Sequence, residues 1–103
     1  MNVANISIQI EQSIGRQKAL EKFKEFANTV PHKYRTQISN LIVHWTAQGS
    51  NFNFMVNKML VSGNLIIDET SVSINGTIPW ALLMFKTQIQ KNVKQYANEI
   101  LKN

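Results

Sequence analysis

The chain has 103 residues, of which 44% are hydrophobic and 17% are charged, a composition typical of a single folded domain over residues 1–103. It contains no cysteine, which excludes disulfides, thiolate metal sites and cysteine nucleophiles. The net charge of +5 favours an anionic partner or simply keeps the protein dissolved. The sequence shows neither a signal peptide nor an apolar run of membrane-spanning length, so we expect a cytoplasmic protein that is not transmembrane.

The first third of the chain predicts a strand followed by a helix. Isoleucines alternate with polar residues over positions 3–10, which is the period of a half-buried strand. Apolar residues then recur at helical spacing over 15–30, with Ser13 as the expected helix cap. Pro31 should end this helix, because the residue before a proline avoids helical geometry.

Four further strands are expected between residues 38 and 75. The segments ISNLIVHWTA, SNFNFMVNK, GNLIID and TSVSIN each place apolar residues on one face, and turn residues separate them, as in an antiparallel meander. The pattern leaves the boundaries of the intervening KMLVSG segment open. Pro79 fits the first turn of a second helix. The apolar stripe of that helix comprises Leu82, Phe85, Ile89, Val93, Tyr96 and Ile100.

The predicted fold is therefore an α+β domain with the order β-α-β-β-β-β-α. Every expected strand has one polar face, so the antiparallel sheet needs cover on one side only. Both helices can lie on that side.

Residue types that perform catalysis or bind metals are few and scattered. His32 and His44 have no second histidine or carboxylate nearby at ligand spacing. The six acidic residues fall on expected helix surfaces or in turns, and there is no glycine-rich phosphate loop. We therefore expect a protein that is not an enzyme and uses no cofactor.

The polar face of the expected sheet argues against a nucleic-acid partner. Alternation places asparagine, serine and glutamine side chains and His44 on it, without the arginines or aromatic residues that bind phosphates and bases. Three apolar side chains interrupt this face and would form a strip that supports a homodimer, unless they are ordinary scattered surface residues. They are Ile42, Met55 and Ile66.

Apolar side chains on the opposite face would converge between the sheet and the last helix. There they form either a close-packed core or a cleft for a small apolar ligand. Lys86 falls near the centre of the helical stripe, where it either extends past the core edge or meets a polar group inside a pocket. The candidate cleft residues are Trp45, Phe52, Phe54, Leu65, Ile67, Lys86 and Ile89.

The second helix begins with the apolar segment PWALLMF. At about 100° per residue, Trp80 and Met84 lie opposite the stripe with Leu83 beside them, and Lys91 and Lys94 follow on the same side. An exposed apolar turn followed by lysines is typical of a helix that binds an interface. In the alternative arrangement, Trp80 and Met84 pack into the core.

In the order and spacing of its segments the chain resembles the small polyhydroxyalkanoic acid system proteins, a granule-associated or granule-regulating family. The resemblance rests on ISIQI, SIGRQKALEKF, Trp45 ahead of FNF, VSGNLIIDETSVSI and LLMFKTQIQKNV. It implies a fold similar to helix-grip proteins and TATA-box-binding proteins. It also implies a non-enzymatic protein that associates with polyester granules or granule proteins. The alternative it leaves open is a small acyl ligand between the sheet and the last helix.

Overall fold

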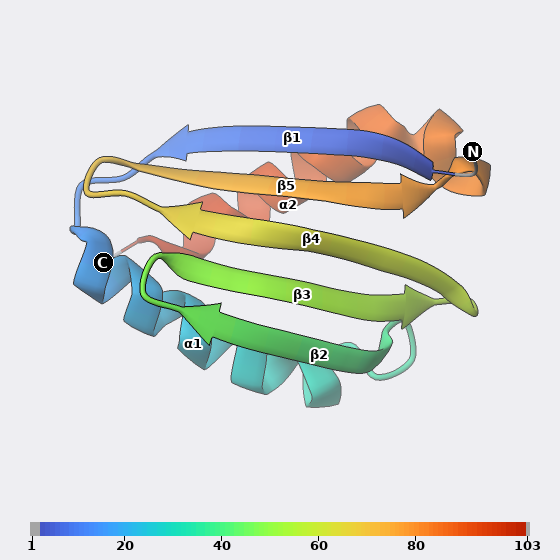
Figure 1. Cartoon of the computed structure of the whole chain (residues 1–103), viewed down its shortest axis with the longest axis horizontal. Helices are drawn as coiled ribbons and strands as arrows, with labels where there is room; N and C mark the ends of the chain where they lie inside the picture. Colours follow the sequence, from blue (N-terminus) through green and yellow to red (C-terminus); the bar gives the residue numbers. More distant parts are fainter. Residues whose placement is uncertain (1–2, 103) are drawn as a thin grey trace.

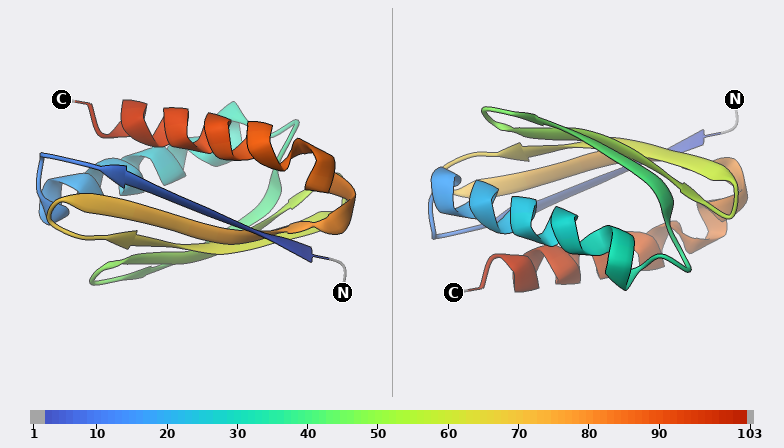
Figure 2. Two further views of the ribbon diagram at one scale, coloured as in Figure 1. Left: turned by 90° about the horizontal axis from the view of Figure 1, so that it is seen from above. Right: turned by 90° about the horizontal axis from the view of Figure 1, so that it is seen from below.

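The computed structural model describes residues 3–102 of the chain. The elements follow one another as β1 (Val3–Glu11), α1 (Arg16–Lys33), β2 (Ser39–Thr46), β3 (Gly49–Val56), β4 (Met59–Ile67), β5 (Ser71–Pro79), the 3₁₀ helix η1 (Trp80–Phe85) and α2 (Lys86–Ile100) (Figure 1). The strands form one antiparallel sheet, and both α-helices lie on the same face of it (Figure 2). The predicted α+β class and element order are confirmed.

The strand order in the sheet is β1-β5-β4-β3-β2. After β1, helix α1 carries the chain across the sheet to its far edge, and the meander returns strand by strand until β5 pairs with β1. The β1–β5 register runs from Val3 opposite Pro79 to Glu11 opposite Ser71. The isoleucines at 6, 8 and 10 are buried beneath the helices, as the alternation predicts.

A two-residue turn joins β3 to β4. Asn57 and Lys58 have φ values of 51° and 66°, the left-handed conformation that the central positions of a type I′ hairpin require. The ladder therefore closes with Val56 opposite Met59. The KMLVSG segment, whose boundaries the sequence left open, supplies the second residue of this turn and the first half of β4.

The core consists of two hydrophobic clusters. The larger joins α1, α2 and the sheet around Ile67 and Val72, which are fully buried. The smaller lies under the other end of the sheet around Ile6, Val61 and Ile78.

A pair of glycines faces across β4 and β5 in the middle of the sheet. Gly63 and Gly76 occupy opposite positions in the ladder. A Cβ on Gly63 would lie 2.3 Å from the Asn75 carbonyl oxygen and 2.9 Å from the Phe52 ring. Glycine is therefore required at position 63, because two strands and an aromatic ring meet there.

The first helix differs from its prediction at both ends. Gly15, with a φ of 87°, occupies the N-cap position, so Ser13 does not cap the helix. Helix α1 also continues through Pro31 to Lys33. Pro31 has no N–H to donate to the Ala27 carbonyl four residues back, so the helix passes through it with one hydrogen bond fewer. The Tyr34 N–H closes the helix by donating to the Val30 carbonyl at 3.0 Å.

Gln12 connects two turns that are distant in sequence. Its Nε2 donates to the carbonyl oxygens of Asp68 and Glu69 at 2.7 and 2.8 Å. Its Oε1 accepts hydrogen bonds from the backbone N–H groups of Ile14 and Gly15. The side chain is only 8% exposed, and it ties the β1–α1 turn to the β4–β5 turn.

Candidate functional site

Four large apolar side chains are exposed on the single segment η1. Trp80 is 63% exposed, Met84 83% and Phe85 48%, and Leu83 is also exposed. These four residues are called the η1 patch below. The patch lies at the end of the molecule where β5 finishes, ahead of α2 (Figure 1).

Leu82 is the large side chain of η1 that faces the core. It packs beside the Ile6, Val61 and Ile78 cluster, whereas Phe85 is exposed. The 3₁₀ spacing alone does not separate these two residues, because side chains three residues apart share a face in such a helix. Phe85 is the N-cap of α2, with φ −100° and ψ 6°, so the helical spacing is interrupted at this residue. The prediction that Phe85 faces the sheet is therefore wrong, because it assumed one continuous α-helix across this junction.

Tyr96 also differs from its predicted place in the stripe of α2. It is exposed, and its ring meets that of Tyr34 edge to face, with 6.3 Å between the ring centroids. A hydrogen bond with the Tyr34 hydroxyl raises the pKa of Tyr96 above its ordinary value. The stripe instead reaches the core through Ala97, which is buried.

Lysines follow the η1 patch along α2. Lys91, Lys94 and Lys102 line a shallow hollow of about 420 Å³ on the outer side of the helix. At about 1.5 Å per residue, Lys91 begins roughly 10 Å beyond Met84 along the helix axis. Glu99 is the one acidic residue that lines this hollow.

The candidate cleft residues divide between the two hydrophobic clusters. Leu65, Ile67 and Trp45 belong to the cluster that contains α1, and Phe54 and Ile89 pack at the other cluster. Phe52 stacks on Phe54, with 6.3 Å between the ring centroids. Lys86 is half-buried at the start of α2. An acyl ligand among these residues stays a prediction.

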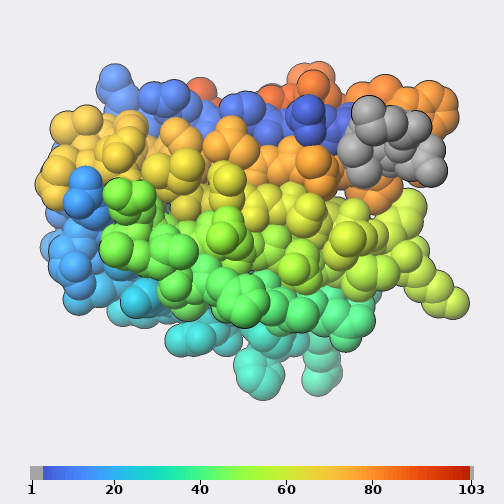
Figure 3. Space-filling model, in the orientation of Figure 1, coloured from blue at the N-terminus to red at the C-terminus, as the bar shows by residue number. Residues whose placement is uncertain are grey.

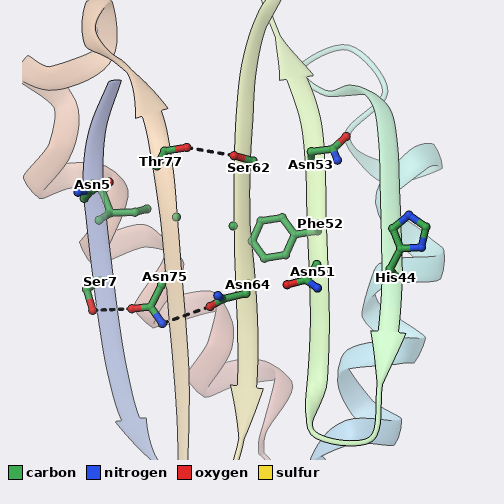
Figure 4. Close-up of a pocket in the computed structure, with 13 residues that line it drawn as sticks. Asn5, Ser7, His44, Asn51, Phe52, Asn53, Ser62, Asn64, Asn75 and Thr77 are labelled. Carbon is green, nitrogen blue, oxygen red and sulfur yellow. Dashed lines mark hydrogen bonds between the residues drawn. The ribbon is translucent and has the colours of Figure 1, made fainter. Parts of the chain in front are cut away.

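Figure 3 views the face of the sheet that the helices do not cover. This open face carries a belt of short polar side chains. The side chains come from five strands and surround a shallow depression of about 610 Å³ (Figure 4). They include five asparagines, a feature that the alternation predicts but to which the sequence alone assigns no role. The polar residues that line the depression are Asn5, Ser7, His44, Asn51, Asn53, Ser62, Asn64, Asn75 and Thr77.

The proposed dimer strip is interrupted by this belt. Met55 lies opposite Leu60, whereas Ile66 lies six residues further along β4, which is about 20 Å. Ile42 pairs with Asn53, which lies two residues before Met55 on β3. The three apolar residues therefore lie at two ends of the open face, with asparagines and serines between them.

Comparison with known proteins assigns the chain to a family. The model of the polyhydroxyalkanoic acid system proteins matches residues 6–101. The chain belongs to this family. No curated protein and no solved structure shows a significant match to the chain.

The match covers η1, all of α2 and the open-face belt except Asn5. Among residues 3–102 there is no group of three or more histidine, aspartate or glutamate side chains arranged to hold a metal ion. Over the same residues, no helix is long and apolar enough to cross a membrane.

Proposed function

We propose that this protein associates with polyhydroxyalkanoate granules by inserting the η1 patch into the granule surface. The observation that carries the proposal is the exposure of Trp80, Leu83, Met84 and Phe85 on one short segment of a polyhydroxyalkanoic acid system protein. Monomeric proteins rarely leave large apolar side chains exposed side by side, because each loses free energy in water. The proposed role is non-enzymatic and cytoplasmic, with the granule surface or its proteins as the partner.

The chemistry of the segment suits an interface between water and an apolar polyester. Complete burial of an apolar side chain the size of Met contributes about 1.5–3 kcal/mol, so two or three such side chains support reversible binding. A tryptophan combines a large apolar ring with one N–H donor, which suits a surface that exposes ester oxygens. Lysines near an anionic coat would add about 1 kcal/mol each, and Lys91 and Lys94 follow the patch on α2.

Co-sedimentation with purified polyhydroxyalkanoate granules tests the proposal. The double substitution Trp80→Ala with Met84→Ala should weaken binding at least tenfold, because it removes the two most exposed apolar side chains of the molecule. As the matched control, Tyr96→Ala removes an exposed aromatic residue from the far part of α2 and should leave binding unchanged.

Fluorescence provides an independent measurement of the same event. Emission from Trp80 should shift to shorter wavelength when granules are added, since its ring leaves water. Binding of the double variant at wild-type strength, or equal losses in the double variant and in Tyr96→Ala, would contradict the role of the η1 patch.

A further inference from the structure

Two rows of polar side chains run across the strands on the open face of the sheet. In each row the residues are cross-strand neighbours, so their side chains project on the same side. The first row comprises Asn5, Thr77, Ser62 and Asn53, and it ends at Ile42. The second comprises Ser7, Asn75, Asn64, Asn51 and His44.

The rows form the two walls of a groove. They lie two residues apart along every strand, which is about 7 Å, and the backbone of Gly63 and Gly76 forms the floor between them. With neighbouring strands about 4.8 Å apart, the groove extends roughly 20 Å from β1 to β2. It is therefore long and shallow, a shape that suits an extended chain better than a compact small molecule.

Hydrogen bonds between the side chains organise the walls (Figure 4). The Ser7 hydroxyl donates to Asn75 Oδ1 at 2.7 Å, and Asn75 Nδ2 donates to Asn64 Oδ1 at 3.2 Å. In the other row, the hydroxyls of Ser62 and Thr77 lie 3.0 Å apart. Because Asn64 uses its carbonyl oxygen as the acceptor, its own N–H groups stay available as donors, next to the amide of Asn51 on β3.

The lining of the groove includes no lysine, arginine, aspartate or glutamate. A phosphate chain needs cations, which the lining lacks. Stacked bases need aromatic platforms on the open face, and the one aromatic residue of the lining, Phe52, alternates with Asn51 and Asn53 and so projects to the helix side. The groove instead combines hydrogen-bond donors with exposed aliphatic side chains at its edges, Ile42 beside the first row and Ile66 beyond the second.

We propose that this groove binds one extended segment of an uncharged polyester chain. The carbonyl oxygens of such a chain can only accept hydrogen bonds, and the side-chain N–H groups of Asn51, Asn53 and Asn64 can donate them. Its alkyl branches would contact Ile42 and Ile66. This inference rests on the proposed association with polyhydroxyalkanoates, and it adds a second site, separate from the η1 patch, that recognises the polymer chain itself.

Titration of the ¹⁵N-labelled protein with water-soluble linear oligomers of 3-hydroxybutyrate tests the groove without any granule. Amide signals from β3, β4 and β5 along the two rows should shift. The double substitution Asn51→Asp with Asn53→Asp replaces amide donors by carboxylates of the same shape, and it should weaken oligomer binding at least tenfold.

Gln9→Glu is the matched control, since it makes the same chemical change on an exposed residue of the open face outside the groove. It should leave oligomer binding within twofold of wild type, as should Trp80→Ala with Met84→Ala.

The inference is overturned if the oligomers shift no signal along the two rows at millimolar concentration, or if they shift only signals of η1. It is also overturned if sedimentation shows that a second copy of the chain occupies this face and excludes the oligomer. Either result leaves granule binding through the η1 patch intact, because co-sedimentation measures that separately.

Discussion

Gln12 shows how much one buried polar side chain contributes in a chain of this length. It satisfies two backbone carbonyls that lie 56 and 57 residues further along the chain and two backbone N–H groups two and three residues away. Buried polar groups that lose their partners are costly, whereas a made hydrogen bond has only a modest net value. The stability of both turns therefore depends on this residue.

We predict that Gln12→Ala lowers the free energy of unfolding by about 2–3 kcal/mol, since all four hydrogen bonds are lost and some backbone groups stay buried without partners. Gln12→Glu should also destabilise, because it keeps the acceptor for Ile14 and Gly15 but turns an oxygen towards the carbonyls of Asp68 and Glu69. Urea denaturation measures both losses.

Gln9 supplies the control for this prediction. It lies on the same strand with an exposed side chain, so Gln9→Ala should change stability by less than about 0.5 kcal/mol. Equal losses of unfolding free energy in Gln12→Ala and Gln9→Ala would show that the hydrogen bonds of Gln12 do not contribute to stability.

Single residues were predictable where one strong force decides their position. The isoleucines of β1 are buried as their alternation predicts, and so are Ile67 and Val72. A strand with one apolar face is stable only when that face is turned towards the core. The role of Gln12 was not predictable, since its partners are adjacent only in the folded chain. No local pattern distinguishes it from an exposed turn glutamine.

At the scale of elements, η1 presents four of its five large apolar side chains to water. Runs of 3₁₀ helix longer than three or four residues are uncommon, and η1 has six. Residues three apart share a face in this conformation, so Trp80 and Leu83 project together. Leu82 alone among the large residues of the segment is half-buried rather than exposed.

This geometry predicts different stability effects at neighbouring positions. Trp80→Ala with Met84→Ala should cost less than roughly 1 kcal/mol per site, because both side chains are mostly in water. Leu82→Ala should cost about 1–3 kcal/mol, since Leu82 packs at the Ile6, Val61 and Ile78 cluster. Thermal melting separates the two cases. A larger loss in the double variant than in Leu82→Ala would mean that Trp80 and Met84 are core residues.

The elements themselves were predictable, and their ends were less so. Periodicity identifies β1, α1 and α2, but it cannot decide how far a helix continues after Pro31 or where a hairpin turns. The β3–β4 turn was missed because Asn57-Lys58 lacks the glycine that usually marks a type I′ turn. The change from 3₁₀ helix to α-helix at Lys86 leaves no signal in the hydrophobic pattern.

At the scale of the whole molecule, the charges and the open groove lie on different surfaces. The lining of the groove is uncharged, whereas lysines gather along α2, next to the η1 patch. The two proposed sites therefore differ in the interactions that they use as well as in their position. The η1 patch combines burial of apolar side chains with electrostatic attraction, whereas the groove depends on hydrogen bonds to a neutral chain.

Ionic strength should reveal this difference. Lys91→Gln with Lys94→Gln should weaken binding to granules coated with anionic lipid several-fold at low salt, and the deficit should vanish near 1 M salt, where charges are screened within about 3 Å. Arg16→Gln with Lys18→Gln removes two exposed cations from α1 as the control. Co-sedimentation across a salt series measures both. An equal loss of granule binding in the α1 and α2 variants would mean that binding depends on the net charge of the protein and not on the position of the lysines.

The α+β class and the cover on one face were predictable for the whole chain, because seven amphipathic segments and one polar sheet face leave few other arrangements. The groove was not predictable, although four of its five asparagines were assigned to the correct face. Its walls exist only because the register brings the polar side chains of five strands into two rows, and register across a sheet is not encoded in any one segment.

The pairing of β1 with β5 has a consequence for how the protein is made. A ribosome delivers β1 first, but its only strand partner begins at Ser71, so the strand must wait until most of the chain has emerged. Strands β2 to β5 can meanwhile pair with one another through short hairpins as they leave the ribosome. The last step of folding is then the docking of β1 and α2, which contact each other closely, onto the finished meander. Topologies with such distant partners fold slowly for their length, so a nascent chain would expose the apolar face of the meander to chaperones until β1 and α2 have docked.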